Sequence, residues 1–470
     1  ALNFAQEDDS IHVASGTYTE NIEWPILKNG IKLIGAGIDQ SIIDGDNSGH
    51  VININNHSGY DVPGYIDNET VISGFTIQNG YIAGAGGGIH LVHASPTLTD
   101  LDIKDNTAAQ GGGIYMSYSL ALIENVVIRD NDAEQYGGAI YHHESYSTII
   151  DAIITGNGSN EKGGGIAYNA CNSSTSNIIR SVIADNSATV SGGGIFFNHA
   201  TPVNLDHVTI ADNNAPEGAG MMIYNKSNIV MSNSIVVDNI GDTEIALLKD
   251  PQSDIETTFD VAYSDIAGGL EGIPTEENCE VNWGDGNIDK DPRFRDLTNS
   301  PYEKDYRILA SSPCINSGDP ESELDSDGTR PEMGAYSHNI GGNVDTVDDW
   351  YVSSAGGNDW DCTGRYNCHF GSIQAALNFA QEDDSIHVAS GTYYENIIWD
   401  GDATGIQLIG ENSETTIING GGIDRVLQII NVDESSSIRG FTITDGFFDG
   451  GGGAGLYIIN SSLLLEDLRV

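Results

Sequence analysis

The sequence predicts an all-β solenoid in which the chain winds through three-strand coils of about 26 residues. The first observation behind this prediction is that short Ile- or Val-rich segments end in Asn at intervals of 25–29 residues. The second is a glycine cluster that lies between these segments, first at 86–88 and last at 218–220. Near-fixed periods of this size indicate a solenoid. The recurring asparagines are Asn79, Asn106, Asn131, Asn157, Asn186, Asn213 and Asn239.

Strands are the elements that the coils are expected to contain. Runs such as VVIRDN at 126–131 and NLDHVTIADN at 204–213 alternate apolar and polar residues and are rich in Ile and Val. Stacked coils would form parallel sheets with alternate apolar side chains inside. Asn at one repeated position can donate to the same Asn of the next coil, which predicts a structural ladder; a ligand groove is the alternative.

A larger repeat divides the chain. Residues 1–24 return at 376–399 with only two differences, Thr19/Tyr394 and Glu23/Ile398. The sequence therefore reads as a window from a tandem array. We expect a β-helix of the first unit over 1–300, an irregular closing segment over 301–349, a linker and capping segment over 350–375, and the start of the next unit over 376–470.

A short helix is expected to cap the coils of each unit. Ser372 is a suitable N-cap for a helix over Ile373–Gln381, which would cover unpaired strands at the end of the stack. The same helix is expected upstream of Asp8 in the first copy, where only residues 1–6 represent it.

The charge balance is strongly acidic. The chain has 18 Lys and Arg against 69 Asp and Glu, a formal charge of −51. Such a charge opposes nucleic acid, anionic membranes and polyanionic sugars, and it favours divalent cations. Since no apolar run approaches the ~20 residues that span a bilayer, membrane insertion of this segment is not expected.

The five cysteines favour an oxidising, extracellular setting. Cys362 and Cys368 lie in a short loop suited to a disulfide, and Cys279 could pair with Cys314. Cys171 is left over. Buried free thiols are the alternative.

One acidic cluster is a candidate for structural calcium. Asp319, Glu323, Asp325 and Asp327 lie in a run that ends in Gly328, and alternating carboxylates of this kind can wrap a hard cation. A solvated acidic loop is the alternative, and 285–291 is a poorer second candidate. No other cofactor is expected.

Several of these segments resemble known families. GGAI at 137–140 with IRDN at 128–131 resembles the repeats of chlamydial polymorphic outer-membrane proteins, with Ile in place of Phe. Residues 350–397 and 286–336 resemble the opening and closing segments of secreted bacterial β-helix repeat proteins. The resemblance implies a right-handed parallel β-helix of the pectate-lyase-like class, with a short N-terminal capping helix, at the cell surface.

The function predicted is structural or adhesive: an extracellular tandem-repeat protein that forms a stalk, fibre or filament, with copies of itself end to end as partners. A glycan-binding adhesin is one alternative, since Tyr115, Tyr141 and Phe196 follow the glycine signal in one register. An internal aromatic stack is the other interpretation of these rings. A polysaccharide lyase or hydrolase is the further alternative, although no residue is assigned a catalytic role. His142-His143-Glu144 breaks the pattern and is interpreted as an outward strand end.

Overall fold

The computed structural model describes the chain except for residues 27, 57–64, 172–173, 201, 251–254, 297–303, 310–311, 326–327, 338–348, 354–369, 381–383, 401–403 and 450–451. The chain divides into two compact units. The first contains Ala1–Phe294, Thr298–Ile308 and Ser312–His338, and the second contains Arg295–Leu297, Leu309–Ser311 and Asn339–Val470.

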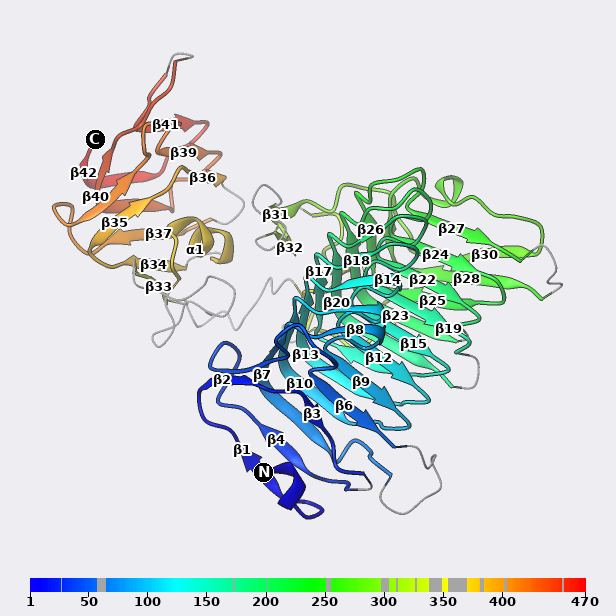
Figure 1. Ribbon diagram of the computed structural model, residues 1–470. Coiled ribbons are helices and arrows are strands. Elements are labelled where there is room, and N and C mark those ends of the chain that lie inside the picture. Colours follow the sequence, from blue (N-terminus) through cyan, green and yellow to red (C-terminus); the bar gives the residue numbers. More distant parts are fainter. Residues whose placement is uncertain are drawn as a thin grey trace. The chain divides into compact units, whose positions relative to one another are not determined.

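The first unit is a right-handed parallel β-helix, which confirms the predicted fold class (Figure 1). Each coil contributes strands to up to three sheets, and consecutive coils pair in parallel, as β10 does with β13. The long sheet contains, in the described part of the chain, β1 (Ser10–His12), β2 (Gly16–Thr19), β4 (Lys32–Ile34), β5 (Ser41–Asp44), β7 (Val71–Gln78), β10 (Thr97–Lys104), β13 (Leu122–Arg129), β16 (Thr148–Ile150), β17 (Ile153–Thr155), β20 (Ser176–Ala184), β23 (Val203–Ala211), β25 (Asn228–Ser232), β26 (Ile235–Val237), β28 (Thr257–Ala262), β29 (Asp265–Ile266) and β30 (Cys279–Trp283).

The other two sheets of this unit are smaller. The second sheet contains β3 (Ile22–Glu23), β6 (Ile52–Asn55), β9 (Ile89–Val92), β12 (Ile114–Ser117), β15 (Ile140–His143), β19 (Ile166–Asn169), β22 (Ile195–Asn198), β24 (Met221–Tyr224) and β27 (Ile245–Leu248). The third sheet contains β8 (Tyr81–Ala85), β11 (Thr107–Gln110), β14 (Asp132–Tyr136), β18 (Gly158–Ser159) and β21 (Ser187–Ala188). The remaining elements before residue 339 are β31 (Phe294–Asp296), β32 (Asp305–Ile308) and the 3-10 turns η1 (Leu2–Phe4) and η2 (Leu270–Gly272).

The core lies inside the coils because alternate residues of each strand point inward. Ile103, Ile128 and Ile154 follow one another in register, and each is fully buried. The glycine signal marks a sharp corner. At Gly192 the backbone φ is +65°, and a Cβ would lie 2.6 Å from the carbonyl oxygen of Ile195. The second and third glycines are less restricted, since Ala219 and Ala139 replace them in two coils.

Residues 304–308 and 312–337, where the structure describes them, pack on the outside of the long sheet. Ile308, Cys314 and Met333 are buried against Ile235 and Val237 of β26. The amide of Gly334 donates to the carbonyl oxygen of Asn233 at 2.8 Å. We call residues 304–337 the closing segment.

The second unit starts a similar β-helix. Its larger sheet contains β33 (Asp349–Val352), β34 (Ser385–Val388), β35 (Gly391–Tyr394), β37 (Gln407–Gly410), β38 (Thr416–Asn419), β40 (Ser437–Thr444) and β42 (Leu464–Arg469), and its smaller sheet contains β36 (Ile397–Asp400), β39 (Leu427–Ile430) and β41 (Leu456–Ile459). The capping helix is α1 (Ile373–Phe379). Ser372 is its N-cap, with Oγ accepting from the Ala375 amide at 3.1 Å. The helix ends two residues before the predicted Gln381, because Ala380 is extended.

Candidate functional site

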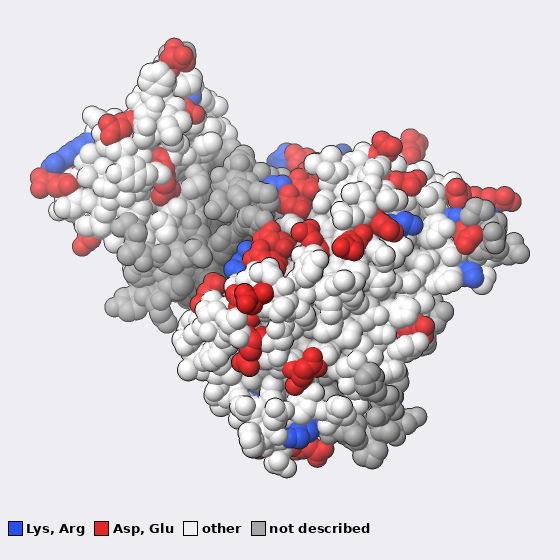
Figure 2. Space-filling view, in the orientation of Figure 1, with Lys and Arg blue, Asp and Glu red and all other residues white. Residues whose placement is uncertain are grey.

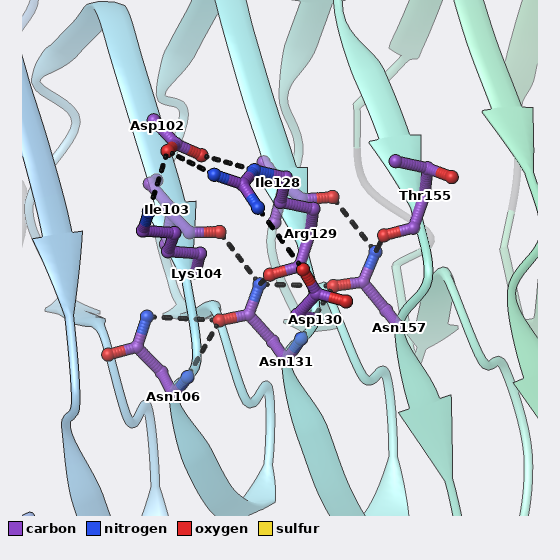
Figure 3. A network of polar contacts seen from close by, with 10 residues as sticks. All are labelled: Asp102, Ile103, Lys104, Asn106, Ile128, Arg129, Asp130, Asn131, Thr155 and Asn157. Carbon is purple, nitrogen blue, oxygen red and sulfur yellow. Dashed lines mark hydrogen bonds and ion pairs between the residues drawn. The ribbon is translucent and has the colours of Figure 1, made fainter. Parts of the chain in front are cut away.

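Six of the seven recurring asparagines stack in one column, shown in part in Figure 3. Nδ2 of Asn131 donates to Oδ1 of Asn157 at 3.0 Å, and the backbone amide of Asn131 donates to the same oxygen at 3.1 Å. The same Nδ2 also donates to the carbonyl oxygen of Ile103 in the preceding coil at 2.8 Å. Asn157 is 1% exposed. We call the following residues the asparagine ladder: Asn106, Asn131, Asn157, Asn186, Asn213 and Asn239.

Asn79 does not lie in the ladder. Ile77 pairs with Ile103, so that Gly80 rather than Asn79 occupies the ladder position of its coil. The amide of Gly80 donates to Oδ1 of Asn106 at 2.8 Å, whereas Nδ2 of Asn79 donates to Asp44 at 2.9 Å. Asn79 is instead the left-handed residue of the corner, with φ of +57°. The side-chain amides of the ladder bond to one another at about 3 Å and are therefore not available to a ligand. The recurring asparagines thus stabilise the turns of the coils and do not line a ligand groove.

A buried ion pair lies beside the ladder (Figure 3). Nε and Nη2 of Arg129 donate to the two carboxylate oxygens of Asp102 at 3.1 and 2.9 Å. Nζ of Lys104 lies 3.7 Å from the same carboxylate. Asp102 is 3% exposed, and burial raises its pKa although Arg129 opposes this. An acidic sugar bound here would need Arg129 and Lys104 as its cationic partners, but both already pair with Asp102.

A row of polar and charged residues along one corner of the long sheet is more exposed than this ion pair. Its members share a left-handed backbone conformation and lie in register on consecutive coils. We call it the corner row: Asp100, Asn125, Asp151, Arg180 and His207. Sequence reasoning missed this row, although a polar residue in the middle of each long strand was the available signal.

Three polar pairs involve members of the corner row. In the first, Nδ2 of Asn125 donates to the Asp100 carboxylate at 2.6 Å. Nε and Nη2 of Arg180 donate to the Asp151 carboxylate at 2.8 and 2.9 Å. Nδ1 of His207 lies 3.2 Å from Oδ2 of Asp206. Burial alone would raise the pKa of Asp206, but hydrogen bonds from His207, Asn233 and Ser232 hold it below its ordinary value. The carboxylate–imidazole pair of Asp206 and His207 thus lies on the coil that follows Arg180, whose guanidinium is half-exposed.

The aromatic residues form two stacks, one outside and one inside the coils. On the outer face of the second sheet, the ring centroids of His90 and Tyr115 lie 5.2 Å apart, and those of Tyr115 and Tyr141 lie 5.8 Å apart. Nζ of Lys162 lies 4.8 Å from the centroid of the Phe196 ring. Because neighbouring rings and Lys162 cover these ring faces, little flat aromatic surface is left for a sugar to stack on.

The inner stack corrects the interpretation of His142. Its side chain is fully buried inside the coils, where it stacks on Tyr168 at 4.1 Å between centroids. It is therefore not an outward strand end, whereas His143 does point outward. Burial lowers the pKa of His142 to about 3. Tyr168 also stacks on Phe197 at 5.4 Å, so the internal aromatic stack exists, but with other residues than Tyr115, Tyr141 and Phe196.

The predicted disulfide between Cys279 and Cys314 is not formed. Both are free cysteines. Cys279 begins β30. Cys314 is a buried residue of the closing segment, and its Sγ lies 3.3 Å from Oδ2 of Asp265. Cys171 is a buried free cysteine. Cys362 and Cys368 lie outside the described residues.

The acidic loop proposed for calcium is partly described. Asp319 accepts from the amide of Glu321 at 2.9 Å, and the carbonyl oxygen of Asp325 accepts from the amide of Gly328 at 2.8 Å. Asp327 lies outside the described residues. Among those that are described, no group of three or more His, Cys, Asp or Glu side chains is arranged to hold a metal ion. The calcium site, with Glu323 included, stays a prediction.

The closing segment brings together four polar side chains, which we call the closing clasp: Lys304, Tyr306, Asp185 and Asp212. Nζ of Lys304 lies 2.9 Å from Asp185 and 3.1 Å from Asp212. The Tyr306 hydroxyl oxygen lies 3.1 Å from Oδ2 of Asp185 and 2.9 Å from Oδ2 of Asp212, so its one proton is shared between the two carboxylates. Burial and the two carboxylates raise the pKa of Tyr306. Its phenol therefore stays protonated and cannot act as a base.

Charge on the surface is mainly negative. Figure 2 shows acidic side chains in several clusters on the visible face of the first unit, with few basic side chains between them. In the described part of the chain, no helix is long and apolar enough to cross a membrane.

No protein-family model matches the chain. No curated protein matches it either. The solved structures that are similar to it include the following three. Pectate lyase Pel9A has 13% identity and a TM-score of 0.38, over 72% of this chain and 90% of that chain. The A-module of the Azotobacter vinelandii mannuronan C-5 epimerase AlgE4 has 14% identity and a TM-score of 0.38, over 60% of this chain and 88% of that chain. The PL6 family alginate lyase AlyGC has 12% identity and a TM-score of 0.31, over 100% of this chain and 76% of that chain. Identities this low indicate nothing about the substrate of this chain. The resemblance to chlamydial polymorphic outer-membrane proteins stays a prediction.

Proposed function

We propose that the chain is a structural module of an extracellular tandem-repeat β-helix protein that forms a stalk, fibre or surface filament. The observation that carries this proposal is the duplicated start of the unit. Residues 10–19 form β1 and β2, and their copies at 385–394 form β34 and β35. Repetition of one self-contained coil stack adds length, whereas catalysis gains little from it.

The polar groups inside the coils support the same proposal. The asparagine ladder, the Asp102–Arg129 pair and the closing clasp all join one coil to the next or to the closing segment. Such contacts stiffen the stack, and the groups that they join are occupied by one another. The negative charge would keep neighbouring filaments apart, and calcium held by the acidic loop at 319–327 would screen it between copies.

Imaging the native protein by negative-stain electron microscopy tests this function. A stalk or fibre is expected to give long or beaded rods whose length scales with the number of repeats. Compact particles of uniform size would contradict it. Repeating the measurement with and without a calcium chelator tests the proposed role of calcium, because rods that shorten or clump only without calcium would support it.

A carbohydrate-active enzyme is the second candidate, and the corner row favours it. His207, paired with Asp206, is suited to transfer a proton, and Arg180 on the preceding coil is suited to hold a sugar carboxylate, although Asp151 already occupies its guanidinium. Assaying a panel of neutral and acidic polysaccharides for cleavage tests this candidate.

The matched variants for that assay are His207→Asn and His199→Asn. Both histidines have left-handed backbone, with φ of +53° and +52°, which Asn tolerates. An enzyme of this kind should lose cleavage in His207→Asn and keep it in His199→Asn. A panel on which the unaltered chain cleaves nothing would leave the structural function as the one supported.

Glycan binding is tested separately on a glycan array. An adhesin would retain specific sugars, and a blank array would count against it. If binding is found, Tyr115→Leu distinguishes the outer aromatic stack from the loops as its location, because Leu keeps the apolar packing and removes the ring.

A further inference from the structure

The two copies of the repeated segment differ in what covers them. In the second unit the residues Ile386, Val388, Tyr393 and Ile397 are at most 3% exposed. Their counterparts in the first unit are Ile11, Val13, Tyr18 and Ile22, and all four are half-buried. The residue types are identical and the strands are the same, so the difference in burial arises from the neighbouring elements.

The strand β33 covers the first of these residues in the second unit. It pairs in parallel with β34, with Trp350 opposite Ile386 and Val352 opposite Val388. The amide of Ala389 donates to the carbonyl oxygen of Val352 at 2.9 Å. The indole Nε1 of Trp350 donates to the carboxylate of Asp384 at 2.6 Å.

The helix α1 packs against β36, the strand that begins with Ile397. The carboxylate of Glu395 accepts from the backbone amides of Ile373 and Gln374, both at 2.9 Å. The side chain of Gln374 makes two bonds to the backbone of Ile398, at 3.0 and 2.7 Å. Ile373 is fully buried in the core of this unit.

The equivalent surface of the first unit is open, and we call it the end face: Ile11, Val13, Tyr18, Glu20 and Ile22. These residues line a cavity of about 400 Å³ together with Leu33, Ile43 and Phe75. Strand β1 pairs with β4 alone among the described strands, so its other edge carries unpaired backbone groups.

We propose that the end face is a docking site for a strand–helix segment with the sequence of residues 349–375. Ile11 and Val13 would take a strand as Ile386 and Val388 take β33, and the carboxylate of Glu20 would cap the helix as Glu395 caps α1. Every side chain that holds the segment in the second unit has an identical counterpart here, since Asp9 matches Asp384 and Tyr18 matches Tyr393.

The two sequence differences fall outside the contacts. Tyr394, which replaces Thr19, is 77% exposed. Ile398 contacts Gln374 through its backbone, which Glu23 can supply equally well. Neither difference removes an interaction that the segment needs.

The test is an extended form of the full chain in which a second copy of residues 349–375 is placed directly before Ala1. This copy joins Ala1 as the original segment joins Ala376. Hydrogen exchange is then measured at the amide of Ala14, the counterpart of Ala389. We expect exchange at Ala14 to slow by about 100-fold, toward the rate at Ala389 in the same molecule.

The matched control carries W350D and V352D in the added copy alone, which places charges on the strand that must be buried. Ala14 is expected to exchange as fast in this control as in the unextended chain. Equal exchange at Ala14 in the unextended and extended chains, with Ala389 protected in both, would overturn the proposal. Protection of Ala14 that rises with the concentration of the unextended chain would also overturn it, because a second copy of the chain would then be the occupant.

Discussion

Nδ2 of Asn239 donates to Oε2 of Glu244 at 2.7 Å, and the asparagine ladder ends on this carboxylate. Each ladder Asn donates toward the next coil and accepts from the preceding one, so the row has a direction. At its end no further Asn accepts from Asn239, and Glu244, 5 residues later, accepts from both its backbone amide and its Nδ2 in that place. The last position of the ladder is therefore closed by a hydrogen bond to a carboxylate, which is stronger than a hydrogen bond between neutral groups.

Replacing a central ladder residue should destabilise the first unit. In Asn157→Ala, the backbone and side-chain amides of Asn131 both lose their acceptor, and Asn186 loses the side-chain donor of Asn157 but keeps its backbone donor. All of these groups stay buried. Buried groups without partners cost about 1–3 kcal/mol each, so we expect the free energy of unfolding to fall by roughly 2–4 kcal/mol in urea denaturation.

Asn204→Ala is the control for that variant. Asn204 lies on the outer face of β23 and donates to Asn177 at 3.1 Å. A partly exposed bond of this kind should cost less than about 1 kcal/mol. Equal losses in the two variants would show that the ladder contributes no more than a surface bond.

Lys304→Met should release the closing segment. The substitution removes the cation between Asp185 and Asp212 and leaves two neighbouring carboxylates, each less than a fifth exposed. Unpairing buried charges costs about 3 kcal/mol or more. We expect faster hydrogen exchange at the amides of Gly334 and Ala335, which bond to the long sheet. Arg307→Met is the control, because Arg307 pairs with Asp305 inside the segment, and its exchange rates should match those of the unaltered chain.

Asp265 should make the first unit less stable as the pH rises. Burial raises its pKa from 3.8 to about 6, with Asp289 and Asp291 adding repulsion. Its contribution is complete below pH 3.8 and is lost as the pH rises through 6, a change of roughly 3 kcal/mol. In Asp265→Asn this loss should disappear when urea midpoints are compared at pH 4 and pH 7. A pH profile that Asp265→Asn leaves unchanged would assign the effect to other acids.

His142 should act in the opposite direction. Burial lowers its pKa from 6.5 to about 3, so its contribution is complete above pH 6.5 and is lost as the pH falls. At pH 4 the loss should reach roughly 3 kcal/mol. His142→Phe keeps the ring against Tyr168 and cannot charge, so its urea midpoint should fall less between pH 7 and pH 4. A parallel fall in both proteins would contradict this role.

The fold could be predicted because the winding leaves a period in the sequence. The ladder, the glycine corner and the capping helix each follow from local chemistry that repeats or has a recognised pattern. Register was the harder part. Asn79 follows Ile77 by two residues, whereas Asn106 follows Ile103 by three, and counting from the buried Ile would have excluded Asn79.

His142 could also have been placed correctly from the sequence. Ile140 points inward, and alternation along β15 then turns His142 inward as well. The closing segment could not be placed, because its contacts join residues such as Lys304 and Asp185 that no period relates. For the same reason the sequence could not show that Cys314 lies beside Asp265 and not beside Cys279, because the packing of the closing segment determines its neighbours.

The closing segment bonds to four successive coils, through Asp185, Asp212, Asn233 and Asp265. An insertion within residues 176–266 must therefore preserve the contacts with the closing segment as well as the stacking of the coils. Between residues 97 and 155 only the winding must be matched, so a complete turn can be gained or lost there. Length differences among natural variants of this protein should concentrate in that stretch.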